Sequence, residues 1–258
     1  MKIKIPDNYL GERREGSMEK VLQSSTKPQN QGDVAIANCQ MQNPRGYIQV
    51  PQFNLAIALR ETNKNLNMYS TLEALAGEGL KIPSPVQFMR HWLNVKEAAE
   101  GSRTLFYADG TPVNNDVSKD LWNYMSSRDR SPWNGQICHT WLNALFISEN
   151  NKWYIENDLK VVPDARGNKT LQGSREKLPP TTLRTDGWVS LNFNEQGLPI
   201  THYSLTCYEQ GENIHFYHPR SSSVARFKVG SYGAYLDCNG DPRNSDSDLG
   251  VRAVRAKN

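Results

Sequence analysis

The chain has 258 residues, of which 37% are hydrophobic and 22% are charged, enough for one large domain or two small ones. Its 30 basic and 27 acidic residues give a net charge of +3, so composition does not support nucleic-acid binding. We expect no signal peptide, because the N-terminal MKIKIPDNYLGERREG has no apolar core. We also expect no membrane insertion, because no apolar stretch reaches the length of a membrane span.

The first half of the chain predicts a polar arm, one strand and three helices. Residues 1–33 are rich in Gln, Lys and Glu and suggest a loosely packed arm. Tyr47–Phe53 alternates apolar and polar residues, which is the period of a half-buried strand. Helices are expected at 68–77, from Ser84-Pro85 to Gly101, and from Asn115-Asp116 onward. Each has apolar residues at helical spacing, and the second begins with a capping Ser and a Pro.

The second half predicts short strands separated by polar turns. Strands are expected near 103–107, 141–146, 153–155, 188–193, 224–227 and 249–254, with a hairpin from 202–207 and 214–217 and a long surface loop over 162–185. Helices followed by strands without β-α-β alternation indicate an α+β fold with antiparallel sheets. We interpret residues 1–258 as a single domain.

The four cysteines stand far apart, at Cys39, Cys138, Cys207 and Cys238, and include no C-x-x-C pair. A disulfide framework is usually denser and occurs in a smaller chain. We expect most of them to be buried small apolar residues.

The tail has an unusual composition. Tyr, Gly, Asp, Asn, Ser and Arg dominate residues 229–248, and Lys, Glu, Gln, Trp and Met are absent there. A turn-rich loop explains the Gly, Asn, Asp and Ser, but it does not explain Tyr232 and Tyr235. Tyr together with Ser, Gly, Asn and Arg is the usual composition of a paratope.

A set of tail motifs resembles a known family. The motifs are Ser223–Phe227 (SVARF), Leu236-x-Cys238, Pro242 and the closing Leu249–Val254 (LGVRAV). This pattern resembles the variable proteins of archaeal diversity-generating retroelements, including those of viruses of methane-oxidising archaea. The resemblance is strongest over residues 220–255, moderate over 131–217 and weak before that.

The resemblance implies a C-type-lectin fold of the formylglycine-generating-enzyme type and a ligand-binding role without catalysis or cofactor. It also implies a changing protein or glycan partner on a cell surface. The protein would then sit on a virion or a host-cell surface, and otherwise in the cytoplasm. In this family adenines of selected codons are randomised, and an Asn codon cannot then yield Lys, Glu, Gln, Trp or Met. The composition of residues 229–248 agrees with that rule, whereas Lys228 departs from it.

The family pattern makes residues 228–248 the variable display region and divides residues 229–249 into two sets. The display residues, expected to vary and to bind ligand, are Gly230, Tyr232, Gly233, Tyr235, Asp237, Asn239, Gly240, Asp241, Arg243, Asn244, Asp246, Ser247 and Asp248. The scaffold residues, expected to be constant, are Val229, Ser231, Ala234, Leu236, Cys238, Pro242, Ser245 and Leu249. Tyr232 and Tyr235 would act as aromatic anchors and Arg243 as a fork donor.

Four other readings stay open. The first is an oxidoreductase like the formylglycine-generating enzymes, although Cys207 and Cys238 are far apart in sequence. The second is a nucleophile at Cys138 activated by His202 or His218. The third is a calcium-dependent lectin that uses the tail aspartates 237, 241, 246 and 248, whose spacing does not match an EF-hand loop. The fourth is a purely structural virion protein.

Overall fold

The computed structural model describes residues 43–128 and 137–256, and these lie in one compact unit delimited as Met41–Asn258. The expected arm at residues 1–33 lies outside the described residues, as do Cys39 and Trp133. The single-domain interpretation of the whole chain therefore stays a prediction.

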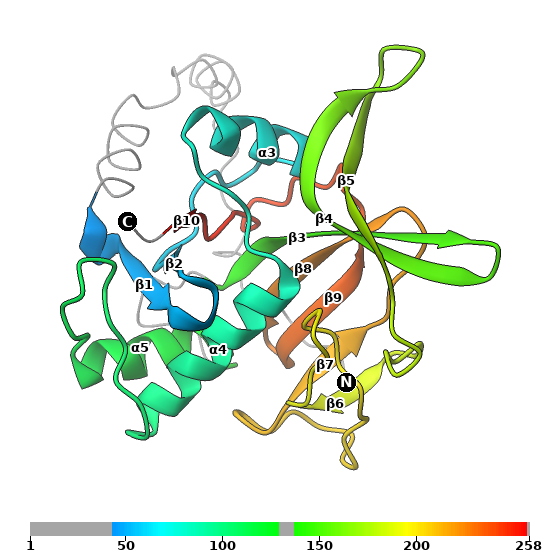
Figure 1. The fold of residues 1–258 in the computed structure, drawn as a ribbon. Helices are drawn as coiled ribbons and strands as arrows, with labels where there is room; N and C mark the ends of the chain where they lie inside the picture. Colours follow the sequence, from blue (N-terminus) through cyan, green and yellow to red (C-terminus); the bar gives the residue numbers. More distant parts are fainter. Residues whose placement is uncertain (1–42, 129–136, 257–258) are drawn as a thin grey trace, which may run out of the picture. The chain divides into compact units, whose positions relative to one another are not determined.

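The described residues form three α-helices and two β-sheets (Figure 1). The helices are α3 (Met68–Gly77), α4 (Pro85–Ala99) and α5 (Asn115–Ser126). The smaller sheet has the order β1-β2-β10, with β1 (Tyr47–Val50), β2 (Leu55–Ala58) and β10 (Val254–Ala256). This mixed architecture confirms the α+β class.

The larger sheet has seven strands in the order β5-β4-β3-β8-β9-β7-β6. The strands are β3 (His139–Glu149), β4 (Lys152–Pro163), β5 (Lys169–Lys177), β6 (Gly187–Ser190), β7 (Asn213–Tyr217), β8 (Ser223–Gly230) and β9 (Gly233–Gly240). Strands β7 and β9 pair in parallel, and the other neighbours in this sheet pair antiparallel.

The three helices begin where the sequence predicts. Asn67, Ser84 and Asn114 cap α3, α4 and α5, because each side chain accepts a hydrogen bond from a backbone N–H of the first turn. At α4 the Gln87 side chain also accepts a hydrogen bond from the Ser84 N–H, which completes a capping box. None of the helices in the described ranges is long and apolar enough to span a bilayer.

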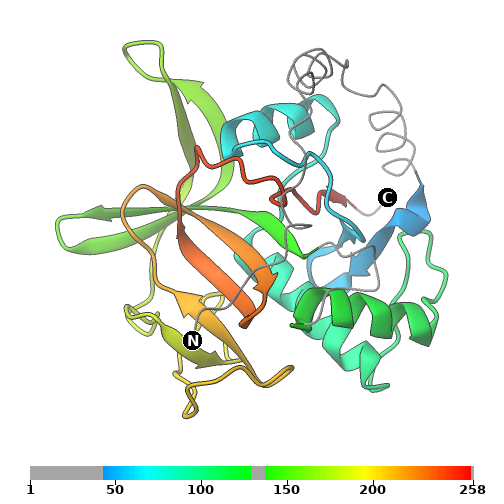
Figure 2. The same ribbon diagram turned by 180° about the vertical axis from the view of Figure 1, so that it is seen from behind.

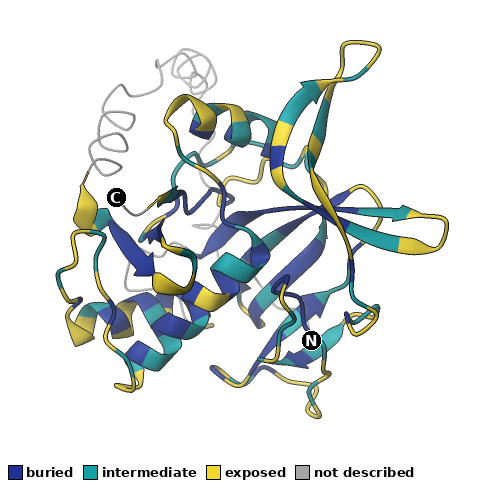
Figure 3. Cartoon of the chain, viewed as in Figure 1, coloured by how far each residue is buried: buried dark blue, intermediate teal, exposed yellow. Residues whose placement is uncertain are grey.

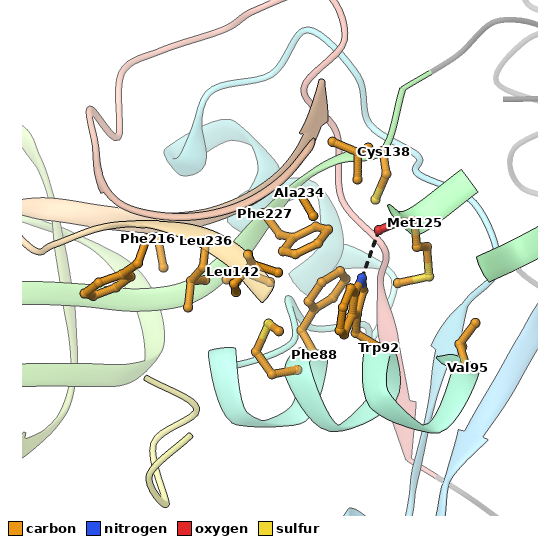
Figure 4. Packing of buried hydrophobic residues seen from close by; sticks show 14 of the residues in the cluster. Phe88, Trp92, Val95, Met125, Cys138, Leu142, Phe216, Phe227, Ala234 and Leu236 are labelled. Atoms are coloured by element: carbon orange, nitrogen blue, oxygen red, sulfur yellow. Dashed lines mark hydrogen bonds between the residues drawn. The ribbon is translucent and has the colours of Figure 1, made fainter. Parts of the chain in front are cut away.

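Helix α4 covers one face of the larger sheet, and Figure 4 shows the contact. Phe88 packs on Phe227 of β8 with ring centroids 4.9 Å apart. Trp92 is fully buried beside them, and its Nε1 donates to the Met125 carbonyl at 2.9 Å. This core fixes the orientation of β8 and β9.

On the opposite face of the sheet, α3 and the closing segment pack around β3, β4 and the start of β8. There Trp141 and Val224 join Leu249 and Val251 of the closing segment and the buried residues of α3 in a second core. The following Arg252 is fully buried and donates to the carbonyls of Ala58 (2.9 Å) and Leu59 (2.7 Å). The closing segment is thus tied to the smaller sheet.

Several sequence expectations are wrong. Residues 202–207 form no strand: His202 makes one bridge to Val189, and β7 pairs with β6 and β9 instead of forming the expected hairpin. Leu205 is 45% exposed, so its apolar character reflects no core packing. The expected loop over 162–185 contains β5, an edge strand held by backbone pairing with β4. Its side chains are mostly polar, so periodicity gave no strand signal.

Three further expectations hold in part. The strand at Tyr47 ends at Val50, and its four residues are all buried rather than half-buried, because three separate clusters cover its two faces. Residues 103–112 make isolated bridges around a turn rather than a strand. The segment 249–254 makes bridges to Thr62 and Thr140 before β10 begins.

In Figure 3 the central strands are buried, and exposed residues gather at the outer turns.

Candidate ligand-binding site

The hairpin of β8 and β9 has two different faces. On one face Phe227 lies opposite Leu236 and Val229 opposite Ala234, and all four are buried. Because successive side chains of a strand point to opposite faces, the intervening residues point away from α4. There Arg226 lies opposite Asp237 and Lys228 opposite Tyr235. In Figure 2 these two strands, in orange, face the viewer with no helix in front of them.

A pocket of about 760 Å³ adjoins this second face. Its lining combines the end of α5 with Tyr217 of β7 and residues of β8 and β9. Five display residues contribute to it: Gly230, Tyr232, Tyr235, Asp237 and Asn239. The volume falls in the range of pockets that hold small ligands.

The remaining display residues lie elsewhere. Gly233 and Gly240 are buried within the hairpin. Residues 241–248, which follow β9, do not line this pocket. In that segment Asp241, Arg243, Asp246, Ser247 and Asp248 are exposed and Asn244 is half-buried. The Pro242 carbonyl accepts a hydrogen bond from the Met68 N–H at 2.9 Å, which fixes this segment against the start of α3.

Most scaffold residues are buried. Val229, Ala234, Leu236, Cys238 and Leu249 are each at most 3% exposed. Pro242 is half-buried, and Ser231 and Ser245 are exposed. Along β9 the scaffold residues Ala234, Leu236 and Cys238 are buried and the display residues Tyr235 and Asn239 are half-buried, but the display residues Gly233, Asp237 and Gly240 are buried as well.

Two display glycines have little room for a side chain. A Cβ on Gly233 would lie 2.3 Å from the Tyr208 ring, and its φ of +125° disfavours other residues. A Cβ on Gly240 would lie 3.0 Å from the Val224 carbonyl oxygen. The sequence interpretation placed both glycines among the variable residues. Backbone geometry constrains both positions, and Gly233 more strongly than Gly240.

Asp237 is also less free than expected, since it is only 8% exposed. Its carboxylate accepts from Arg226 Nε at 2.8 Å and from the Asn239 N–H at 3.0 Å. A second carboxylate, that of Asp246, lies 3.9 Å from the Arg226 guanidinium. Arg226 therefore links the hairpin to the turn that follows it.

Aromatic rings extend the site across β7 and β6. Strand pairing aligns Tyr235 with His215, and His215 with Trp188. The Tyr217 and Tyr235 rings are nearly parallel, with centroids 6.2 Å apart. Burial raises the pKa of Tyr235, and the neighbouring Tyr217 adds to the shift. The Tyr235 hydroxyl therefore stays protonated at neutral pH and can donate a hydrogen bond.

Sequence reasoning missed several residues of this pocket, among them Tyr217, Arg128 and Arg226. Tyr217 enters through the parallel pairing of β7 with β9, which no local pattern reveals. Arg128 enters from the end of α5, where it stacks over the Tyr208 ring at 5.1 Å. Arg226 belongs to the motif Ser223–Phe227. Because adjacent residues of a strand point to opposite faces, the apolar Phe227 next to it could have indicated that Arg226 faces away from the core.

Three of the four tail aspartates, Asp237, Asp241 and Asp246, lie within ion-pairing distance of an arginine. Asp241 pairs with Arg243 at 3.1 Å, and that side-chain hydrogen bond is the main cause of its lowered pKa. Asp237 is held by Arg226, as described above. Within residues 43–128 and 137–256, no three His, Cys, Asp or Glu side chains gather as metal ligands would.

The candidate nucleophiles are buried or have other partners. Burial raises the pKa of the Cys138 and Cys238 thiols, so both stay protonated at neutral pH. Cys207 is exposed, and none of the three is in a disulfide. His202 bonds Thr185, and His218 pairs with Asp186. The geometry thus gives no support to a Cys–His nucleophile at these residues.

Comparisons with protein-family models, with curated proteins and with solved structures find no match for this chain.

Proposed function

We propose that this protein is a non-enzymatic ligand-binding protein whose C-terminal hairpin and following turn form a binding surface diversified by a retroelement. Its fold would be of the C-type-lectin kind, and its partners would change as the display residues change. The proposal rests on the sequence resemblance and on the two-faced hairpin.

One observation carries the proposal. Along β9 the scaffold residues Ala234, Leu236 and Cys238 are fully buried, whereas the display residues Tyr235 and Asn239 line the pocket. Substitution of side chains that do not pack in a core usually changes stability by less than about 0.5 kcal/mol. A rigid sheet can therefore carry changing side chains at these positions.

A display library tests this proposal. Tyr232, Tyr235, Asn239, Arg243 and Asp248 are randomised together and selected against several unrelated proteins and glycans. We expect folded, target-specific binders. The control library randomises residues 150, 151, 166 and 168, which lie at the two outer turns of β3–β4 and β4–β5 and are exposed. Equal yields from the two libraries, or a first library that is mostly unfolded, would contradict the proposal.

The coding DNA offers an independent test of diversification. We expect an imperfect repeat of the segment that encodes residues 228–248, beside a reverse-transcriptase gene, with differences confined to adenines of the repeat. Differences spread evenly over all bases would argue against retroelement mutagenesis.

A further inference from the structure

Lys228 stands out among the charged groups of the pocket. Strand pairing places it between His139 of β3 and Tyr235 of β9, and it lines the pocket. Arg226, two residues earlier, is held by Asp237 at 2.8 Å. Among the described residues no carboxylate lies within ion-pairing distance of the Lys228 ammonium. Lys228 is therefore a cation of the pocket with no acidic partner in this part of the chain.

The surroundings of Lys228 are positively charged. Arg128, Arg226 and Lys228 line the pocket with one carboxylate, that of Asp237. The pKa of His139 is lowered to about 3, first by burial and then by the charges of Lys228 and Arg226. An anionic group bound at Lys228 would offset this positive charge.

Aromatic rings lie next to this cation. Tyr235 is the cross-strand neighbour of Lys228, and Tyr217 lies beside Tyr235 at a ring angle of 26°. Tyr217 and Lys228 are outside the display residues, so the cation and one ring would stay constant while Tyr235 varies. Ring faces suit the C–H face of a sugar, and the tyrosine hydroxyls and the Asn239 amide suit its hydroxyl groups.

We propose that this pocket binds an acidic sugar through its constant residues Lys228 and Tyr217. The sugar carboxylate would lie at Lys228, and the sugar ring would lie against Tyr217 and residue 235. The inference rests on the proposed function and narrows it to a ligand class. A hollow of about 760 Å³ admits one or two sugar rings.

Two sugars that differ in one group test the inference. The full chain is titrated with methyl β-glucuronide and with methyl β-glucoside, which carry a carboxylate and a hydroxymethyl group at the same carbon, and binding is followed by NMR. We expect the glucuronide to bind about tenfold more tightly, as for a charge-assisted hydrogen bond. Lys228→Gln should abolish the difference, whereas the control Lys152→Gln, exposed at the start of β4, should keep it. Melting curves check that both variants fold.

The outcomes separate this inference from the proposed function. Equal affinity for the two sugars, an undiminished preference in Lys228→Gln, or no binding of the glucuronide at concentrations up to about 50 mM would overturn the acidic-sugar site. Protein binders from the display library would still support the proposed function in that case. Conversely, a glucuronide preference that survives while the library yields no binders would support the sugar site and count against diversified display.

Discussion

Adjacent residues of β9 lie in opposite environments, although only one peptide bond separates them. Leu236 is fully buried against Phe227, while Tyr235 lines the pocket beside Tyr217. Tyr232, at the hairpin turn, is 75% exposed. Burial therefore distinguishes the side chains that stabilise the fold from those that can change with little loss of stability.

Truncation of these side chains should give graded effects. Leu236→Ala should lower the free energy of unfolding by about 2–5 kcal/mol, because it leaves a cavity in the core. Tyr235→Ala should cost about 1 kcal/mol, from the lost ring contacts, and Tyr232→Ala less than about 0.5 kcal/mol. Urea denaturation of the three variants measures this order, and equal losses for Leu236→Ala and Tyr232→Ala would contradict it.

Gly233 and Gly230, which pair at the hairpin turn, should differ in how well they tolerate an added side chain. Gly233→Ala should destabilise the protein by more than about 1 kcal/mol, because the new methyl group meets the Tyr208 ring and the positive φ is unfavourable. Its register partner Gly230 is the control, since a Cβ there would lie 3.5 Å from Tyr235, an ordinary contact. A Gly233→Ala variant that melts with the wild type would show that this position is free to vary.

Among the elements, the helices could be predicted more completely than the sheets. Local signals mark a helix start: the Ser84 cap was predicted from Ser84-Pro85, and α3 and α5 begin at the expected Met68 and Asn115. No comparable local signal in the sequence indicates which distant strands pair with each other. The parallel pairing of β7 with β9 and the polar edge strand β5 were therefore not predicted. Tyr217 was absent from the predicted site for the same reason, because only the pairing of β7 with β9 brings it there.

The capping box of α4 should be measurable. Ser84→Ala removes the oxygen that accepts from the Gln87 N–H, and it should cost about 1 kcal/mol of stability. Ser84→Asp keeps an acceptor at the cap and should lose much less. Thermal melting distinguishes the two variants, and identical losses would assign the effect to something other than the cap.

At the scale of the whole molecule, buried histidines link stability to pH. Burial lowers the pKa of His139 to about 3 and that of His91 well below its ordinary value. Both rings are neutral in the folded protein near pH 6, whereas the unfolded chain protonates them below about pH 6.5. The unfolded state then binds more protons, so stability falls as pH decreases from about 6.5 toward 3.

Removal of His139 should weaken this dependence. Between pH 7 and 5 the wild type should lose more unfolding free energy than His139→Gln, with a difference approaching about 1 kcal/mol per pH unit at the acidic end. Urea denaturation at several pH values measures both slopes. Parallel slopes would mean that His139 is not held neutral in the folded state.

The most direct test of the central claim exchanges several exposed display side chains at once. Tyr232, Arg243, Ser247 and Asp248 are replaced together by Ser, Ser, Asn and Ser, and the melting temperature is compared with that of the wild type. We predict a decrease of no more than about 5 °C, because these residues lie outside the core. The control triple variant Val229→Ala, Leu236→Ala and Leu249→Ala should fail to fold cooperatively. Unfolding of the display variant would contradict the separation of binding side chains from the scaffold beneath them.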